Sequence, residues 1–258
     1  MKTILDKMKL NHPVVLVHGM GARSKYGPFD YFHGLPKLLR DAGNEVFTPN
    51  LTAWHTVEHR AEQLKRQIEV RFPDQKVNLI GHSLGGLDAR YMTSRLECVE
   101  RVASVTTIGT PNRGTLIADL ALGLVPNATF KVADRFLKLL DSSSGAFQQI
   151  CAKYHSNIFS TEVPDAPGVG YFSATSAIPN PIMKHSLPLF WLSTQLLSRY
   201  EGDNDGFVSV QSALWGQHIC TYQGDHYAQI GQFLGRSRGL DYMQFYTDIF
   251  SRLKKEGF

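Results

Sequence analysis

Short apolar runs alternate with stretches of helical periodicity through the first half of the chain. The apolar runs are rich in β-branched residues and predict strands buried on both faces; they cover residues 14–17, 45–47, 77–80 and 102–108. Helical stretches separate them, with apolar residues at spacings of three and four that predict amphipathic helices; these cover residues 35–42, 57–68 and 84–96. A strand pattern returns at 169–174 and 218–222, and a helix is predicted over 242–253.

Strands that alternate with helices in this way predict βαβ units and a mostly parallel sheet. Right-handed crossovers then place helices on both faces of the sheet. Ligands of such sheets bind beyond the carboxyl ends of the strands. Because no internal repeat or linker interrupts the pattern, we expect one α/β domain over residues 1–258.

Residues 112–155 interrupt the strand–helix alternation and are predicted to be helical. Within them an apolar stripe ends at a break over Ser142–Gly145; the stripe consists of Val132, Ala133, Phe136, Leu137 and Leu140. An insertion at this point would lie over the carboxyl edge of the sheet, where it could act as a helical cap or lid. The alternative is an ordinary layer of core helices.

The composition excludes several classes of protein. The 258 residues are 43% hydrophobic and 19% charged, which is typical of a globular chain. A net charge of +4 is too small to indicate a nucleic-acid partner. The three cysteines, Cys98, Cys151 and Cys220, are too widely spaced for a zinc cluster or a disulfide framework.

The N-terminal segment does not predict an export signal. Residues 1–7 lack an apolar core. No run approaches the ~18 apolar residues of a transmembrane span. We therefore expect no transmembrane segment and a cytoplasmic location, and secretion by another route stays open.

The segment Gly81-His82-Ser83-Leu84-Gly85 matches the pattern G-x-S-x-G and lies between a predicted strand and a predicted helix. That context predicts a tight turn that lifts the serine hydroxyl above the sheet. Glycines on either side remove side chains that would collide there. Ser83 is therefore the candidate nucleophile.

A serine hydroxyl needs a histidine that accepts its proton and a carboxylate that orients the histidine. His226 follows the predicted strand 218–222 at the carboxyl edge and is the candidate base, in preference to His155, His185 and His218. For the carboxylate, Asp205 is chosen because it lies where its loop returns to the fold.

Two other aspartates remain alternatives to Asp205. Asp203 lies further out in the same loop and suits an Asx turn, and Asp225 is adjacent to His226 in sequence. The oxyanion requires two backbone amides, which we assign to Leu84, directly after the nucleophile, and to Met20 in the glycine-rich loop after the first strand.

These motifs together resemble the bacterial triacylglycerol lipases of the Pseudomonas, Burkholderia and Proteus type. The resemblance rests on five segments in the same order across nearly the whole chain, namely residues 13–20, 81–86, 107–114, 204–208 and 225–226. It implies an α/β-hydrolase fold, hydrolysis of carboxylic esters and a mobile helical lid. It also supports Asp205 over Asp203.

The chain departs from that family where the family commonly binds calcium. The position two residues after the histidine, where the family has an aspartate ligand, is Ala228, although a glutamine is present as Gln232. Loss of a carboxylate removes both charge and a ligand from a calcium site. We therefore expect no metal ion and no cofactor.

Competing functions stay open at this stage. His55-Thr56-Val57-Glu58-His59 reads H-x-x-E-H, which is a zinc-hydrolase motif, but no second metal-binding motif follows it. A non-catalytic binding module would usually lack a member of the triad. An acyltransferase or thioesterase with the same triad is not excluded.

The expected substrate is a small ester or a lipid, with possible transient contact at a lipid–water interface. An apolar stretch over residues 187–197 could line an acyl pocket or form a core helix.

Overall fold

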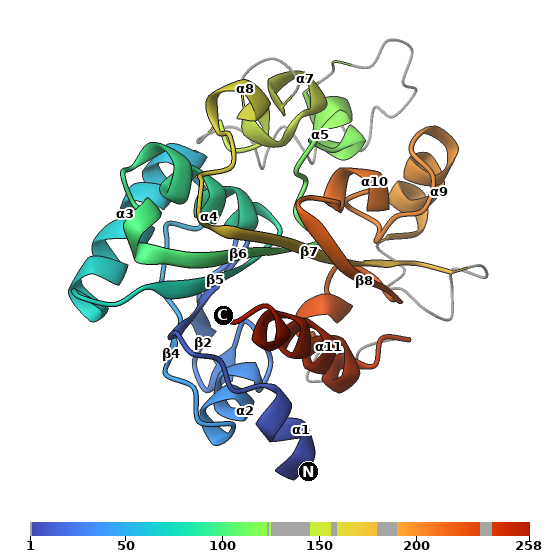
Figure 1. Cartoon of the computed structure of the whole chain (residues 1–258). Coiled ribbons are helices and arrows are strands. Elements are labelled where there is room, and N and C mark those ends of the chain that lie inside the picture. Colours follow the sequence, from blue (N-terminus) through green and yellow to red (C-terminus); the bar gives the residue numbers. More distant parts are fainter. Residues whose placement is uncertain (1, 123, 125–144, 156–158, 180–189, 233–238) are drawn as a thin grey trace.

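A six-stranded parallel sheet with the order β4-β1-β5-β6-β7-β8 forms the centre of the molecule (Figure 1). The computed structural model describes the chain except for residues 1, 123, 125–144, 156–158, 180–189 and 233–238. The strands are β1 (Val14–Val17), β4 (Val46–Phe47), β5 (Val77–His82), β6 (Val102–Ile108), β7 (Gly170–Ala177) and β8 (Gln217–Gln223). A separate antiparallel pair consists of β2 (Lys25–Tyr26) and β3 (Phe29–Asp30).

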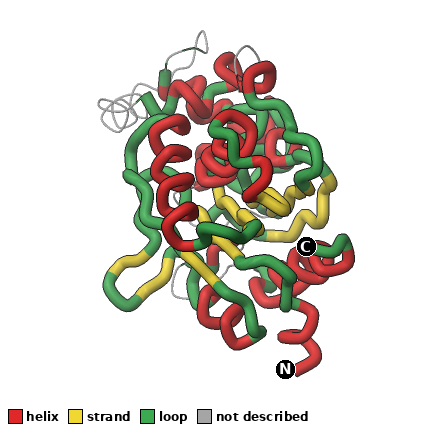
Figure 2. Tube along the Cα trace, turned by 60° about the vertical axis from the view of Figure 1, so that its left-hand side comes forward, coloured by secondary structure: helices red, strands yellow, loops and turns green. Residues whose placement is uncertain are grey.

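Helices enclose the sheet on both sides (Figure 2). The first half of the chain contains α1 (Lys2–Lys7), α2 (Leu35–Asp41), α3 (Val57–Arg71), α4 (Leu84–Arg95), the 3₁₀ turn η1 (Val99–Arg101) and α5 (Leu116–Ala121). The second half contains η2 (Gln148–Ile150), α7 (Ala152–Tyr154), α8 (Ser160–Glu162), α9 (Trp191–Tyr200), α10 (Val210–Ala213), η6 (Ala228–Ile230) and α11 (Tyr242–Lys255).

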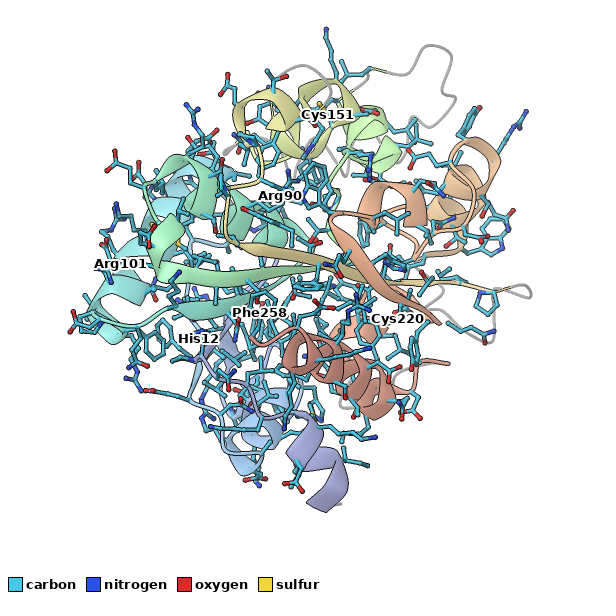
Figure 3. The ribbon with its side chains drawn as sticks, viewed as in Figure 1. His12, Arg90, Arg101, Cys151, Cys220 and Phe258 are labelled. Carbon is cyan, nitrogen blue, oxygen red and sulfur yellow. The ribbon has the colours of Figure 1, made fainter. Side chains whose placement is uncertain are left out.

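Alternate residues of β1 supply two separate cores, because successive side chains of a strand point to opposite faces. Val14 and Leu16 pack with α2 and α11 on one face, whereas Val15 and Val17 pack with α3 and α4 on the other. Figure 3 shows this division, with Phe258 beside α11 and Arg90 on the opposite face. A strand buried on both faces must be apolar throughout, which is why the run at 14–17 has no polar alternation.

The described part of the 112–155 segment packs against the start of α4. Leu84 and Leu87 share an apolar cluster with Phe147, Ile150 and other buried residues of this region. The stripe over 132–140 and the serines at 142–144 lie outside the described residues. The division into one domain with a cap therefore stays a prediction.

The predicted parallel sheet with helices on both faces is confirmed, and β6 has the bounds that its apolar run predicts. The structure adds α1, the hairpin β2–β3 and α10, which the apolar pattern did not predict. The hairpin strands are only two residues long, too short to show any alternation. None of the described helices is long and apolar enough to cross a membrane.

Candidate active site

The candidate nucleophile lies on a sharp turn between β5 and α4. Ser83 has φ 55° and ψ −129°, a backbone conformation that non-glycine residues rarely adopt. The turn is possible because the neighbouring glycines permit close contacts. A Cβ atom on Gly81 would lie 2.4 Å from the Gly85 carbonyl oxygen, and one on Gly85 would lie 2.4 Å from the Val17 carbonyl oxygen. Gly81 therefore allows the turn to close tightly on itself, and Gly85 allows it to lie against β1.

The candidate base and acid are hydrogen-bonded to each other beside this turn. His226 Nδ1 lies 2.7 Å from Asp205 Oδ2, and the His226 amide donates to the Asp205 carbonyl at 2.8 Å. The rings of His226 and His82, the residue before Ser83, are 4.5 Å apart between centroids. The structure thus brings Asp205, His226 and the Ser83 turn together, although these residues are far apart in the sequence.

The Asp205 carboxylate is fully buried and accepts hydrogen bonds at both oxygens. Oδ1 accepts from the amides of Phe207 at 2.9 Å and Val208 at 2.7 Å. Oδ2 accepts from Gln229 Nε2 at 2.8 Å as well as from His226. Four donors therefore satisfy both oxygens of this buried carboxylate and fix its orientation toward His226.

The other candidate acids and bases lie elsewhere. Asp203 is exposed, and Asp225 Oδ1 accepts from the Ala228 amide at 2.8 Å. His218 contacts Ser173 and Thr221 on the sheet. His155 is buried between Tyr154 and Phe159, and His185 lies outside the described residues.

Arg60, a fully buried residue of α3, hydrogen-bonds to the loop that carries the Met20 amide. Its guanidinium donates to the His18 carbonyl at 2.8 Å, the Thr52 carbonyl at 2.7 Å and Asp88 Oδ2 at 2.9 Å. Asp88 belongs to α4, the helix that follows Ser83, so one buried ion pair ties this helix to the loop of His18 and Met20, the candidate oxyanion loop. Burial raises the pKa of Asp88 to about 6 against the opposing effect of Arg60.

His18 holds the same loop through its side chain. Its Nε2 accepts from the Leu51 amide at 3.0 Å, so Nδ1 carries the proton and donates to the Gly19 carbonyl at 2.9 Å. Burial and the nearby Arg60 lower the pKa of His18 to about 4, which keeps this arrangement neutral. Among the described residues, we find no backbone or side-chain acceptor for the Met20 and Leu84 amides. Both amides are therefore available to a ligand.

Sequence reasoning missed Arg60, although a signal for it exists. Arg60 lies three residues after Val57 on the apolar face of α3, where a charged residue requires a buried partner. Which partner it finds could not be predicted, because Asp88 comes from another helix. Gln229 was missed because its partner, Asp205, likewise comes from another segment of the chain.

We expect Gly19→Ala to lower kcat by about 10²–10³, the loss that follows removal of one oxyanion donor. A Cβ atom there would lie 2.8 Å from the Tyr31 hydroxyl oxygen and 3.0 Å from Ser83 Cβ, so the loop must move. Turnover of a soluble p-nitrophenyl ester measures the effect. Gly168→Ala is the control for lost stability: nothing lies within 4 Å of its added methyl group, but alanine is strained at φ 78°, so Tm should fall while kcat stays unchanged. Unchanged kcat in Gly19→Ala would show that the loop tolerates a side chain.

Two described residues near His226, Ala228 and Gln232, do not offer free side-chain ligands to a calcium ion. Ala228 is buried and offers no ligand atom from its side chain. The Gln232 amide nitrogen donates to the carbonyls of Asp30 and Tyr31 at 3.2 and 3.0 Å. This side chain thus already joins the loop of His226, called the base loop here, to the end of β3.

The H-x-x-E-H segment spans the start of α3, with Thr56 as the N-cap of the helix. The rings of His55 and His59 stack with centroids 3.7 Å apart, and His59 Nε2 lies 3.0 Å from Gln63 Nε2. Glu58 accepts hydrogen bonds from Gln149 and Tyr154. In the described part of the chain, no group of three or more histidine, cysteine or acidic side chains could hold a metal ion.

We expect chelation by EDTA to leave turnover and Tm unchanged. The physical reason is that Ala228 supplies no ligand and Gln232 is already engaged. Turnover and thermal melting are measured before and after dialysis against the chelator. Loss of activity that calcium restores would contradict the inference that the loss of a carboxylate at Ala228 abolishes a calcium site. Restoration by zinc would instead indicate a zinc site at His55 and His59.

Comparisons with known proteins identify the family of the chain. A sequence model of the family described as "alpha/beta hydrolase fold" matches residues 12–157. A triacylglycerol lipase of Pseudomonas fragi is 29% identical, over 98% of this chain and 99% of that protein. The triacylglycerol lipases of Pseudarthrobacter phenanthrenivorans and Burkholderia plantarii are each 30% identical to this chain. Each alignment covers 87% of this chain, and the two cover 90% and 80% of those proteins, respectively. The chain belongs to the α/β-hydrolase family, in the group that contains these bacterial lipases, which confirms the resemblance read from the motifs.

Solved structures support the fold. A Bacillus licheniformis lipase in its mature form superposes with a TM-score of 0.69 at 22% identity, over 93% of this chain and 91% of that chain. A Staphylococcus hyicus lipase gives 0.67 at 16% identity, over 97% and 98% of the two chains.

Proposed function

We propose that this protein is a serine hydrolase that cleaves carboxylic esters of small or lipid-like substrates through an acyl-enzyme on Ser83. The observation that carries the proposal is the buried Asp205–His226 pair beside the strained serine turn. Membership of a family whose curated relatives are triacylglycerol lipases supports it.

In the first half of the reaction the Ser83 oxygen attacks the ester carbonyl carbon. Since His226 Nδ1 donates to Asp205, Nε2 is the nitrogen that takes the serine proton. The carbonyl oxygen becomes an oxyanion that accepts hydrogen bonds from the Met20 and Leu84 amides. The alcohol then leaves with the proton from His226 Nε2, and the acyl group remains on Ser83.

The second half repeats these steps with water. His226 takes a proton from the water molecule, whose oxygen attacks the acyl carbon. The bond to Ser83 breaks, the proton returns to the serine oxygen and the carboxylic acid leaves. Asp205 stays ionised throughout and stabilises the imidazolium in both halves.

Transient contact with a lipid–water interface is part of the proposal. Trp191 and Leu192 on α9 are 51% and 42% exposed, which is costly in water and favourable against lipid. Phe190, the residue directly before this helix, is buried, and its ring lies 5.5 Å from that of Tyr227, the residue after His226.

A fluorophosphonate probe followed by peptide mass spectrometry tests the chemistry directly. We expect one adduct, on Ser83, and loss of activity in proportion to labelling. Hydrolysis of p-nitrophenyl esters of graded acyl length then defines the substrate range. An adduct elsewhere, or full activity after complete labelling of Ser83, would contradict the proposal.

A further inference from the structure

The side chain of His82 connects three segments that meet beneath the candidate site. It belongs to the last residue of β5, directly before Ser83, and is fully buried. Its Nε2 lies 3.1 Å from the backbone carbonyl oxygen of His226, and its Nδ1 lies 2.8 Å from the Tyr31 hydroxyl. Tyr31 in turn lies against Gly19 of the oxyanion loop. The nucleophile turn, the base loop and the oxyanion loop therefore share one polar chain.

The partners of His82 define its tautomer. A backbone carbonyl can only accept, so the proton lies on Nε2 and is donated to His226. Nδ1 is then an acceptor and takes the hydrogen bond of the Tyr31 hydroxyl. The hydrogen bond from Tyr31 thereby stabilises the His82 tautomer that can donate to the His226 carbonyl.

The His82 ring is neutral and cannot act as a second base. Burial and the nearby His226 hold its pKa well below the ordinary value. Phe32 and Tyr31 cover the ring with centroids 6.5 and 5.8 Å away, and the ring of His226 lies 4.5 Å away. A neutral imidazole next to His226 adds no full charge to the site, so its contribution is geometric.

We propose that His82 is a positioning residue that fixes the distance between Ser83 and His226. This proposal rests on the proposed function of those two residues. The His226 amide and Nδ1 both bond to Asp205, so they hold the base to the acid but not to the nucleophile. The hydrogen bond from His82 to the His226 carbonyl ties this acid–base unit to the turn that carries Ser83. Loss of that bond would let the unit shift as a whole.

A shift of about 1 Å in a reacting group can lower the rate about 10²-fold without any change in the chemistry. We therefore expect His82→Leu to lower kcat for a soluble p-nitrophenyl ester about 10- to 10²-fold, with KM nearly unchanged. His82→Gln keeps an N–H donor at the position of Nε2 and should retain kcat within a few-fold. If the site needed only the volume of the His82 ring, His82→Gln would lose as much kcat as His82→Leu.

Ser104→Ala provides a matched control. The Ser104 hydroxyl donates a buried hydrogen bond of 2.7 Å to Asn78 in the same sheet, away from the site. Its loss should lower Tm as a buried polar deletion does, with kcat unchanged. A fall in kcat that merely accompanied lower stability would also appear in this control.

A second readout separates positioning from folding. The proton shared by His226 Nδ1 and Asp205 gives a low-field NMR signal, which should exchange faster with water in His82→Leu than in His82→Gln. If His82→Leu does not fold, Tyr31→Phe removes the donor to Nδ1, and we expect a several-fold lower kcat and faster exchange of the same proton.

The outcomes distinguish this proposal from the proposed function. Wild-type kcat and exchange in His82→Leu would overturn the positioning role, as would equal losses in His82→Leu and His82→Gln. If His82→Leu does not fold, wild-type kcat and exchange in Tyr31→Phe would overturn it. In each of these cases labelling of Ser83 by the phosphonate would leave the ester-hydrolase proposal intact. Absence of Ser83 labelling in the wild-type protein would instead remove the basis of both.

Discussion

Ser83→Ala is expected to lower kcat for a p-nitrophenyl ester by about 10⁶, because no other group can carry the acyl intermediate. The fold should persist. The Ser83 side chain makes no hydrogen bond to cap α4, and alanine meets the same backbone strain at φ 55° as serine does. Steady-state turnover and thermal melting by circular dichroism measure the two effects separately.

Ser251→Ala on α11 is the matched control for this variant. It removes the same hydroxyl from a helix that packs on the opposite face of the sheet, and it should leave kcat and the phosphonate reaction unchanged. Near-normal turnover in Ser83→Ala, with Ser251→Ala as reference, would place the nucleophile elsewhere in the chain.

The succession of strands and helices along the chain and the choice of candidate site residues followed from local signals. The apolar run at 102–108 is buried on both faces, so its limits coincide with those of β6. The serine turn was predictable because glycines, strand and helix occur within a few residues. Asp205 and His226 were chosen for their places at the carboxyl edge, where the topology of a parallel sheet brings distant loops together.

The supports of the site could not be predicted in the same way. Arg60 and Asp88 meet only because α3 packs against α4. Tyr31 and His82 are 51 residues apart, and their hydrogen bond depends on the fold of the segment that follows the β2–β3 hairpin. Such contacts are set by tertiary packing, and a single sequence contains no periodicity that reports them.

Asp205→Asn is expected to lower kcat by about 10⁴, the loss seen when the acid of such a triad becomes an amide. The structure explains why the amide would be oriented wrongly. The amides of Phe207 and Val208 donate to Oδ1, so they would hold the asparagine carbonyl oxygen at that position. The NH₂ group would then take the place of Oδ2 and face His226 Nδ1. A donor there stabilises the tautomer with its proton on Nε2, the nitrogen that must accept the proton of Ser83.

Asp203→Asn makes the same chemical change two residues earlier and serves as the control. Its side chain is exposed, and its contact with Val210 is made by the backbone carbonyl, which the substitution leaves in place. We expect kcat within a few-fold of the wild type, measured on the same ester. The reverse ranking would make Asp203 the acid. Small losses in both variants would mean that His226 is oriented well enough by its backbone bonds alone, since the His226 amide still donates to the Asp205 carbonyl in either variant.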